Sequence, residues 1–288
     1  MSRLNNSFRI SQLSIPGTHG TMARYGPLGS AQILGWNTDR AVNQTMNLTT
    51  QLNSGIRYID IRCRHYNNSF QMHHGPIFQR AGFGSGVLDP IRTFLRNNPN
   101  ETILMRVQEE HEPQGNTRSF GATFAEYHSR YSDIFGNPTS NNPTLGEVRG
   151  RIILLQQFSG SLFGINYGSL DIQDQWNIAS GLFPGNIYNK WIAIRNHFNR
   201  TMNDSNRSSA NSRIYLNHLS ANTSSIRPPL VTDWWPYPWF VASGYQRRFN
   251  NSSEEVATSL QSQAYNWPDY IRARSIVGLR LTLFCRNK

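Results

Sequence analysis

Charged side chains and histidines gather between Gln51 and Gln79, in a pattern that suits an anionic ligand. Residues 58–64 read Tyr-Ile-Asp-Ile-Arg-Cys-Arg. In a strand these side chains alternate, so Asp60 and Arg62 lie on one face and the apolar residues on the other. A second candidate strand ends in His73 and His74. An arginine and a histidine at neighbouring strand ends can bind a phosphate. The alternative is an edge strand whose charged face is solvated.

Eight short apolar segments are candidate strands. They are residues 13–15, 57–62, 70–74, 102–108, 151–156, 170–174, 214–219 and 276–284. Several are apolar on both faces, as strands covered on both sides must be. Helical segments separate them, including one from Asp89-Pro90 to Asn97 and one from Ser252 to about Tyr265.

These elements predict a single α/β domain over residues 1–288, a distorted (β/α)8 barrel of the TIM type. Strands joined mainly by helices or loops favour a parallel barrel, and no internal repeat or linker divides the chain. The alternative is an open doubly wound sheet, but the glycine-rich phosphate turn of that fold is not found after the first strand.

Polar residues follow the candidate strands with some regularity. In a parallel barrel, active-site groups lie at the carboxyl ends of the strands. The residues of this chain at those ends are His19, Asp60, Arg62, His74, Gln108, Glu109, Glu110, Gln156, Gln157, Asp174, Trp176 and His218. Solvated loops alone would not be expected to give so regular a pattern.

The composition predicts a soluble globular protein with an anionic partner. A net charge of +11 favours nucleic acid, a phosphate-bearing substrate or an anionic membrane surface. No apolar run approaches the ~20 residues that span a bilayer. Cys63 and Cys285 suit neither a disulfide framework nor a zinc cluster, so we expect two free thiols. No signal peptide is visible after Met1, whereas Asn-x-Ser/Thr triplets such as residues 47–49 favour a secreted, extracellular chain.

Several motifs, in order and spacing, resemble one family. The main ones are residues 13–19 (Leu-Ser-Ile-Pro-Gly-Thr-His), 60–62 (Asp-Ile-Arg) and 72–76 (Met-His-His-Gly-Pro); shorter ones lie at 98–103, 150–155, 159–161, 172–174 and 217–221. Together they resemble the X region of the bacterial phosphatidylinositol-specific phospholipases C, over nearly all of the chain. The resemblance implies a distorted (β/α)8 barrel that cleaves phosphatidylinositol, or glycosyl-phosphatidylinositol anchors, to diacylglycerol and inositol 1,2-cyclic phosphate.

The resemblance also implies catalytic roles. The inositol 2-hydroxyl must lose a proton as it attacks phosphorus, and the leaving oxygen must gain one, which requires a base and an acid. By the family's pattern His19 is the base and His74 the acid. Arg62 stabilises the phosphate charge, and Asp60 orients its guanidinium.

Substrate contacts are expected for five further residues. Asp174 matches a carboxylate that binds inositol hydroxyls, and Trp176 matches an aromatic ring that stacks on the inositol. Apart from the resemblance, the run Gln108–Glu112 predicts a solvated mouth of the barrel in which Glu110 is a candidate inositol contact. Gln108 and Gln157 stand where the family has a lysine and an arginine. Two cationic contacts are therefore lost, and head-group recognition is expected to be weaker or altered.

The pattern departs from the family around the first histidine as well. Gly20 stands where the family has an aspartate. By spacing, Leu283 stands where an aspartate normally supports His19. We expect an acceptor from another strand end to take over that support; the alternative is an intrinsically slow enzyme.

No metal or cofactor is expected. In eukaryotic relatives calcium stabilises the phosphate, and Arg62 stands in its place here. The run Gln108–Glu112 lacks a second ligand at helical spacing. The aromatic residues of a proline-containing segment, Trp234, Trp235, Trp239 and Phe240, are expected to form a rim that inserts into the lipid interface.

The favoured interpretation is a monomeric phospholipase C acting at a phosphatidylinositol-containing membrane. One alternative is a catalytically weakened barrel that only binds inositol lipid or membrane. Another is a barrel phosphodiesterase for a different lipid head group, such as a glycerophosphodiesterase or a sphingomyelinase D-like enzyme, which would need a divalent metal. A nucleic-acid binder fits least, since no Lys/Arg-rich helix or RNA-binding signature is present.

Overall fold

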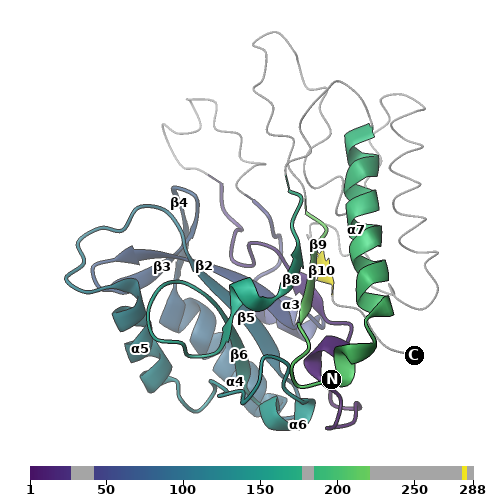
Figure 1. Ribbon diagram of the computed structural model, residues 1–288. Coiled ribbons are helices and arrows are strands. Elements are labelled where there is room, and N and C mark those ends of the chain that lie inside the picture. The colour runs from purple at the N-terminus through teal and green to yellow at the C-terminus, as the bar shows by residue number, and fades with distance from the viewer. Residues whose placement is uncertain (27–41, 177–184, 221–280, 284–288) are drawn as a thin grey trace.

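The computed structural model of the protein describes residues 1–26, 42–176, 185–220 and 281–283 (Figure 1). The strands are β1 (Pro16–Thr18), β2 (Tyr58–Tyr66), β3 (Ser69–His74), β4 (Ile77–Gly82), β5 (Ile103–Glu109), β6 (Ile152–Gln157), β7 (Ile165–Asn166), β8 (Asp171–Gln173), β9 (Tyr215–His218) and β10 (Leu281–Leu283). The α-helices are α3 (Leu48–Asn53), α4 (Asp89–Asn97), α5 (Phe120–Arg130), α6 (Leu145–Val148) and α7 (Gly185–Asn203). Short helical turns are η1 (Ile10–Gln12), η2 (Gly84–Leu88), η3 (Tyr167–Ser169) and η4 (Ser205–Ser208).

One sheet contains all ten strands. Its order is β7-β6-β5-β2-β1-β10-β9-β8, and the β3–β4 hairpin is attached to β2. Strands β1, β2, β5, β6 and β7 are mutually parallel, as are β8 and β9, whereas β10 is antiparallel to both of its neighbours. The two ends of the path, β7 and β8, are consecutive in the chain. The order is therefore that of a barrel, and within the described residues this barrel is not closed between β7 and β8.

The predicted barrel class is confirmed, with differences in three of the strands. The first strand is β1 at residues 16–18. Residues 13 and 15, which the prediction placed in this strand, are buried in the core but precede the paired residues. Residues 70–74 form a hairpin with β2 rather than a barrel strand, since Asn67 and Asn68 both have positive φ and turn the chain straight back. The last described strand, β10, is antiparallel. The predicted helix at 89–97 is confirmed as α4, and the one at 252–265 lies outside the described residues.

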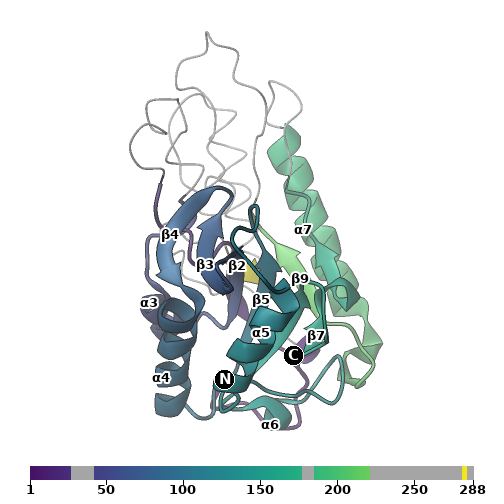
Figure 2. The ribbon, with the colours of Figure 1, turned by 90° about the vertical axis from the view of Figure 1, so that its left-hand side faces the viewer.

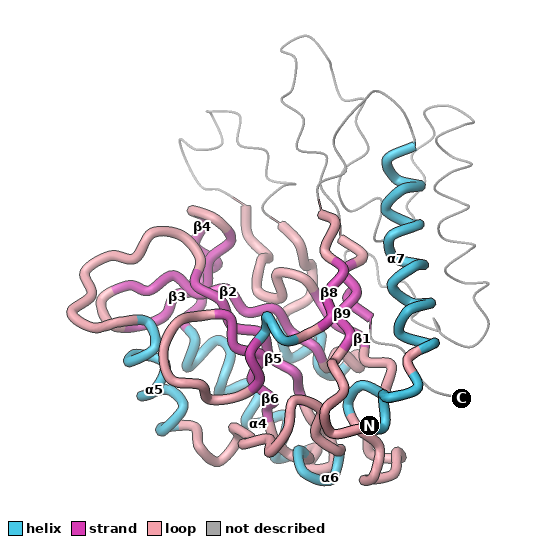
Figure 3. The backbone as a smooth tube through the Cα atoms, viewed as in Figure 1, coloured by secondary structure: helices cyan, strands magenta, loops and turns pink. Residues whose placement is uncertain are grey.

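Helices cover the outer face of the sheet. Figures 2 and 3 show α4 and α5 outside β2, β5 and β6, and α7 beside β8 and β9. Alternate residues of the strands, such as Ile61, Met105 and Leu154, face these helices and pack with Phe94 and Phe124 in one core. This core holds the outward-facing side chains of these strands in place.

A second apolar core fills the inner side of the sheet. It contains Ile15, Tyr58, Leu104, Leu155 and Leu216, all of them buried. Because side chains alternate along a strand, the next inward positions of β2 and β5 continue this stack toward the carboxyl ends. The inward residues are apolar at the beginning of each strand and polar at its end, so a polar layer lies on an apolar base.

Close packing of β1 on β2 gives a first testable prediction. A Cβ on Gly17 would lie 2.6 Å from Cδ1 of Tyr58, which is buried. We expect Gly17→Ala to lower the free energy of unfolding by about 1–3 kcal/mol, as overpacking does, in urea titrations. Gly82→Ala is the matched control, because its Cβ would meet nothing nearer than 3.8 Å. Equal effects of the two variants would contradict the packing argument.

Candidate active site

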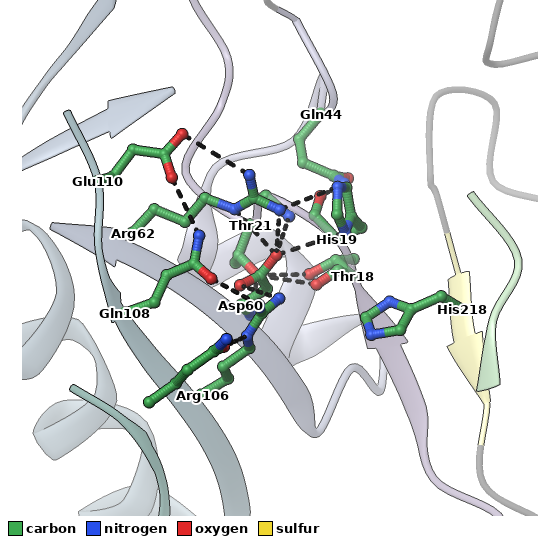
Figure 4. Close-up of polar contacts among 12 residues, drawn as sticks. Thr18, His19, Thr21, Gln44, Asp60, Arg62, Arg106, Gln108, Glu110 and His218 are labelled. Atoms are coloured by element: carbon green, nitrogen blue, oxygen red, sulfur yellow. Dashed lines mark hydrogen bonds and ion pairs between the residues drawn. The ribbon is translucent and has the colours of Figure 1, made fainter. Parts of the chain in front are cut away.

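The carboxylate of Asp60 is the centre of a polar cluster formed by the turn after β1 and by the inner face of β2 and β5 (Figure 4). Its side chain is fully buried. Oδ2 accepts hydrogen bonds from the Gly20 N–H at 3.0 Å and from Nη2 and Nε of Arg62 at 3.0 and 3.2 Å. Oδ1 lies 3.2 Å from Nη1 of Arg106. Burial alone would raise the pKa of Asp60, but the charges of Arg62 and Arg106 hold it well below its usual range.

His19 lies between this carboxylate and an arginine. Its Nδ1 is 3.4 Å from Oδ2 of Asp60, and its Nε2 is 3.0 Å from Nη2 of Arg62. A guanidinium can only donate, so Nε2 accepts and the ring proton sits on Nδ1, facing Asp60. This is the tautomer that a general base needs, because the lone pair of Nε2 points away from the supporting carboxylate.

The turn that carries His19 is fixed by buried hydrogen bonds. Thr21 bonds to Asp60 through both backbone and side chain: its N–H donates to the Asp60 carbonyl at 3.0 Å, and its hydroxyl accepts from the Asp60 N–H at 2.8 Å. Gln51, on α3, accepts from the Thr18 hydroxyl at 2.8 Å and donates to the Thr21 carbonyl at 3.0 Å. His19 is thereby held against β2 from two directions.

Arg62 is held on three sides. Besides Asp60 and His19, its Nη1 lies 3.7 Å from Oε1 of Glu110. Burial lowers the pKa of Arg62, but the two carboxylates outweigh that effect and raise it. The side chain is 14% exposed, which leaves a charged guanidinium open at one edge. This is what binding a phosphate oxygen requires.

Arg106 is the site residue that the sequence analysis missed. It lies on β5 directly opposite Asp60 of β2, is buried, and stacks over the Tyr167 ring with its guanidinium carbon 4.4 Å from the centroid. Nε donates to Oε1 of Gln157 at 2.7 Å, and Nη2 donates to Oε1 of Gln108 at 2.5 Å. The available signal was a charged residue at an inward position of an otherwise apolar strand.

The end of β3 is tied to the same cluster. His74, the predicted acid, is half-buried there. The N–H of the next residue, Gly75, donates to Oε1 of Glu110 at 2.7 Å. His73 points elsewhere: it is buried, its Nδ1 lies 3.3 Å from the Gly75 carbonyl, and its ring stacks on His111 at 5.8 Å. Burial lowers the pKa of His73, as expected of a structural histidine.

Asp174 and Trp176 follow β8 on the exposed side. The N–H of Trp176 donates to the Asp174 carbonyl at 2.8 Å, and 51% of Trp176 is exposed. Both residues are accessible to a ligand at the carboxyl end of β8. Beneath them Lys190 of α7 is buried and donates to Oε1 of Gln173 at 3.1 Å; burial lowers the pKa of Lys190 to about 8, although the charge of Asp174 acts in the opposite direction.

His218 packs below His19, with the two ring centroids 5.8 Å apart in an edge-to-face arrangement. The Tyr167 hydroxyl lies 3.1 Å from Nε2 of His218. Burial lowers the pKa of His218 to about 4, so this ring is neutral at physiological pH. It forms a neutral floor for His19. The aromatic residues predicted for the membrane rim, Trp234, Trp235, Trp239 and Phe240, lie outside the described residues.

Comparison with known proteins identifies the family. The family model described as phosphatidylinositol-specific phospholipase C, X domain, matches residues 37–158. A 1-phosphatidylinositol phosphodiesterase of Listeria monocytogenes is 32% identical over 281 residues, covering 91% of this chain and 76% of the relative. This chain belongs to the phosphatidylinositol-specific phospholipase C family. A Staphylococcus aureus enzyme with the same name is 28% identical over 243 residues, covering 76% of this chain and 74% of that protein.

Solved phospholipase C structures share the fold. The Listeria monocytogenes phosphatidylinositol-specific phospholipase C superposes with a TM-score of 0.61 at 33% identity, covering 79% of this chain and 80% of that one. A Staphylococcus aureus phosphatidylinositol-specific phospholipase C superposes with a TM-score of 0.64 at 27% identity, covering 76% of each chain. The predicted family and barrel class are thus confirmed.

The glycine that departs from the family pattern has a structural cause. Gly20 has a φ of +53°, and a Cβ there would collide with the side-chain amide of Asn43. Its N–H is also one of the donors to Asp60. An aspartate at this position would be strained and crowded, so its absence is built into the turn.

The missing support for His19 also has an explanation. Leu283 of β10 is paired with Pro16, at the start of β1, rather than with the residue beside His19. Position 283 is therefore remote from the histidine along the strand. The carboxylate that faces Nδ1 of His19 is Asp60, from another strand end. A substitute acceptor for His19 therefore stays a prediction, with Asp60 as its candidate.

Three further observations concern metal, membrane and thiols. Among the described residues, no three His, Cys, Asp or Glu side chains are grouped so as to hold a metal ion. In the same part of the chain, no helix combines the length and apolarity needed to cross a bilayer. Cys63 is a buried free thiol, and Cys285 lies outside the described residues.

The ion pairs of Asp60 predict a pH-dependent stability. Asp60→Asn leaves two arginines without their buried carboxylate, so we expect it to lower the free energy of unfolding at pH 7 by about 3–5 kcal/mol. Because the native pKa of Asp60 lies below that of the unfolded chain, this contribution is complete above about pH 4 and is lost as pH falls further. Urea titrations from pH 7 to pH 3 should therefore show the gap between wild type and variant shrinking.

The control for this prediction is Asp133→Asn. Asp133 pairs with Arg92 at 2.5 Å, but its side chain is 45% exposed. A surface pair of this kind contributes about 0–1 kcal/mol. A gap that stays constant down to pH 3, or an Asp60 variant no less stable than the control, would contradict the assigned ionisation of Asp60.

Proposed function

We propose that the protein is a phosphatidylinositol phosphodiesterase of the phospholipase C type, with His19 as base, His74 as acid and Arg62 on the phosphate. The observation that carries this proposal is the contact between Nη2 of Arg62 and Nε2 of His19. A phosphate bound by the guanidinium would bring a hydroxyl of the attached inositol to the lone pair of the histidine. Base and electrostatic stabiliser then act on the same phosphodiester.

The reaction follows from these positions. Nε2 of His19 removes the proton of the inositol 2-hydroxyl as that oxygen attacks phosphorus. Asp60 stabilises the imidazolium that forms, through the proton on Nδ1. The bond to the diacylglycerol oxygen breaks while His74 donates a proton to it. The products are diacylglycerol and inositol 1,2-cyclic phosphate.

Substrate binding must change one contact of the site. Arg62 donates to Nε2 of His19, which occupies the lone pair that the base needs. A phosphate oxygen is a stronger acceptor for a guanidinium than a neutral imidazole, so the phosphate takes over this donor. Nε of Arg62 remains bonded to Asp60 and keeps the guanidinium in place. Binding thereby frees the base.

A membrane surface is the proposed partner, and the chain is proposed to be secreted and to act peripherally. The net charge of +11 favours an anionic bilayer. Leu162 and Trp176, which follow the carboxyl ends of β6 and β8, are 63% and 51% exposed and can contact lipid. The aromatic rim, the single domain, the monomeric state and the contacts of Asp174 and Trp176 with inositol stay predictions.

Product analysis tests the function directly. Phosphorus NMR of reactions with phosphatidylinositol should show inositol 1,2-cyclic phosphate, in excess EDTA as well as without it, because Arg62 supplies the charge that calcium would otherwise supply. Phosphatidylcholine should give no product, since it has no hydroxyl placed to attack its phosphorus. Sphingomyelin should give no product either, because its head group lacks the inositol 2-hydroxyl; a cyclic phosphate formed from its ceramide hydroxyl would contradict the proposed head-group selectivity. Absence of cyclic phosphate would overturn the proposed reaction, and loss of turnover in EDTA would overturn the role of Arg62.

The two histidines can be told apart by the leaving group. We expect His19→Gln and His74→Gln each to lower kcat on phosphatidylinositol by roughly 10²-fold or more, the scale of general acid–base catalysis. On an inositol phosphodiester of p-nitrophenol, which leaves without protonation, His74→Gln should recover most of its rate and His19→Gln should not. His73→Gln is the control and should keep near wild-type rates on both substrates. Recovery by the His19 variant instead would reverse the two assignments.

A further inference from the structure

Five side chains, one of them Arg62, form a closed ring of polar contacts (Figure 4). Asp60 binds Arg62 on one side and Arg106 on the other. Arg106 donates to Gln108, Gln108 donates to Glu110 at 3.0 Å, and Glu110 lies 3.7 Å from Arg62. Two carboxylates and two guanidinium groups make the formal charge of the ring zero.

Gln108 has a chemical role in this ring that a lysine could not fill. On one side it must accept from Arg106, and on the other it must donate to Glu110. A side-chain amide has both an acceptor and donors, whereas an ammonium group has donors only. A lysine at this position would also place a second cation at hydrogen-bond distance from the guanidinium of Arg106.

Arg106 and Gln108 are alternate residues of β5, so both side chains lie on the inner face. Relative to the lysine expected at position 108, the cation has moved two residues down the strand, into the buried layer. There it bonds to both glutamines that stand in the expected cationic positions, Gln108 and Gln157. Gln157 is exposed, and because its Oε1 accepts from Arg106, its NH₂ group is directed away from the guanidinium.

From this geometry we infer that Arg106 is a positioning residue for the phosphodiesterase reaction. Through Gln108 and Glu110 it fixes the guanidinium of Arg62, and through Gln157 it presents an amide donor to a hydroxyl of the head group. The inference rests on the proposed function. Arg106 is then one displaced cation in place of the lysine and the arginine that the family pattern has at positions 108 and 157.

Charge-swapping variants test the ring. Gln108→Lys gives the ring a charge of +1, Arg106→Gln gives −1, and the double variant restores zero. We expect each single variant to lower kcat at least tenfold, and we expect the kcat of the double variant to exceed that of either single variant. This recovery arises because the introduced ammonium group can donate to Glu110 once the competing guanidinium is gone. A Gln108→Lys enzyme as fast as wild type, or a double variant that only multiplies the two losses, would overturn the inference.

Gln157→Leu separates the two parts of the proposal. It removes the donor to the head group and the acceptor of Arg106 Nε, whereas the five contacts of the ring itself remain, so KM should rise about tenfold with kcat nearly unchanged. The control for losing a buried arginine is Arg207→Gln, since Arg207 is 8% exposed and Arg106 7%. We expect it to lower the melting temperature without changing kcat or KM. A fall in kcat with unchanged KM for Gln157→Leu would refute the donor role.

Melting temperatures of wild type, both single ring variants and the double variant test the contacts without substrate. Each single variant should lower the melting temperature more than the double variant does, because the double variant restores the charge balance of the ring. Additive losses would overturn the ring itself. Wild-type protein that gives no cyclic phosphate while these melting temperatures are coupled would instead refute the proposed function and leave the ring in place.

Discussion

The buried carboxylate of Asp60 is the interaction on which the site depends. A fully buried carboxylate is costly unless it is paired and hydrogen-bonded, and this one is met by two guanidinium groups, a backbone N–H and a histidine. These partners come from three parts of the chain: the turn after β1, β2 itself, and β5. Satisfying one charge therefore fixes the side chains of His19, Arg62 and Arg106 relative to one another.

The register of the sheet places the partners on β2, β5 and β6 side by side on neighbouring strands. In the parallel pairing of β2 and β5, Asp60 lies opposite Arg106 and Arg62 lies opposite Gln108. In that of β5 and β6, Gln108 lies opposite Gln157. A shift of one residue in either register would turn the polar set into the outer core, against the helices. The apolar residues that face outward on β2, β5 and β6 therefore determine the chemistry of the inner face.

Much of this was predictable from the sequence because the signals are local. Alternation along residues 58–64 places Asp60 and Arg62 on one face, and the strand-end positions of His19 and His74 follow from short apolar runs. The apolar run at residues 70–74 predicts a barrel strand, whereas the structure has a hairpin there, with Asn67 and Asn68 forming its turn.

Other parts of the site depend on pairing between distant segments, which the sequence alone does not specify. Arg106 gains its role from the register that sets it opposite Asp60, 46 positions away. The 3.4 Å between Nδ1 of His19 and Oδ2 of Asp60 likewise joins the turn after β1 to β2, and no local pattern gives that distance. Spacing along the last strand predicts position 283 as the one that supports His19. In the structure β10 is antiparallel and pairs Leu283 with Pro16 instead.

A displaced cation changes what the site can recognise. At position 108 a lysine would face the ligand directly and attract any anionic or strongly hydrogen-bonding group. Arg106 is instead satisfied by Asp60 and two amide oxygens, so its charge is used within the protein. In the role proposed for it, the amide of Gln157 faces the ligand instead, as a neutral donor polarised by the guanidinium behind it. On this proposal phosphate binding is left to Arg62, whereas the groups proposed to surround the inositol offer hydrogen bonds without net charge, which suits neutral hydroxyls.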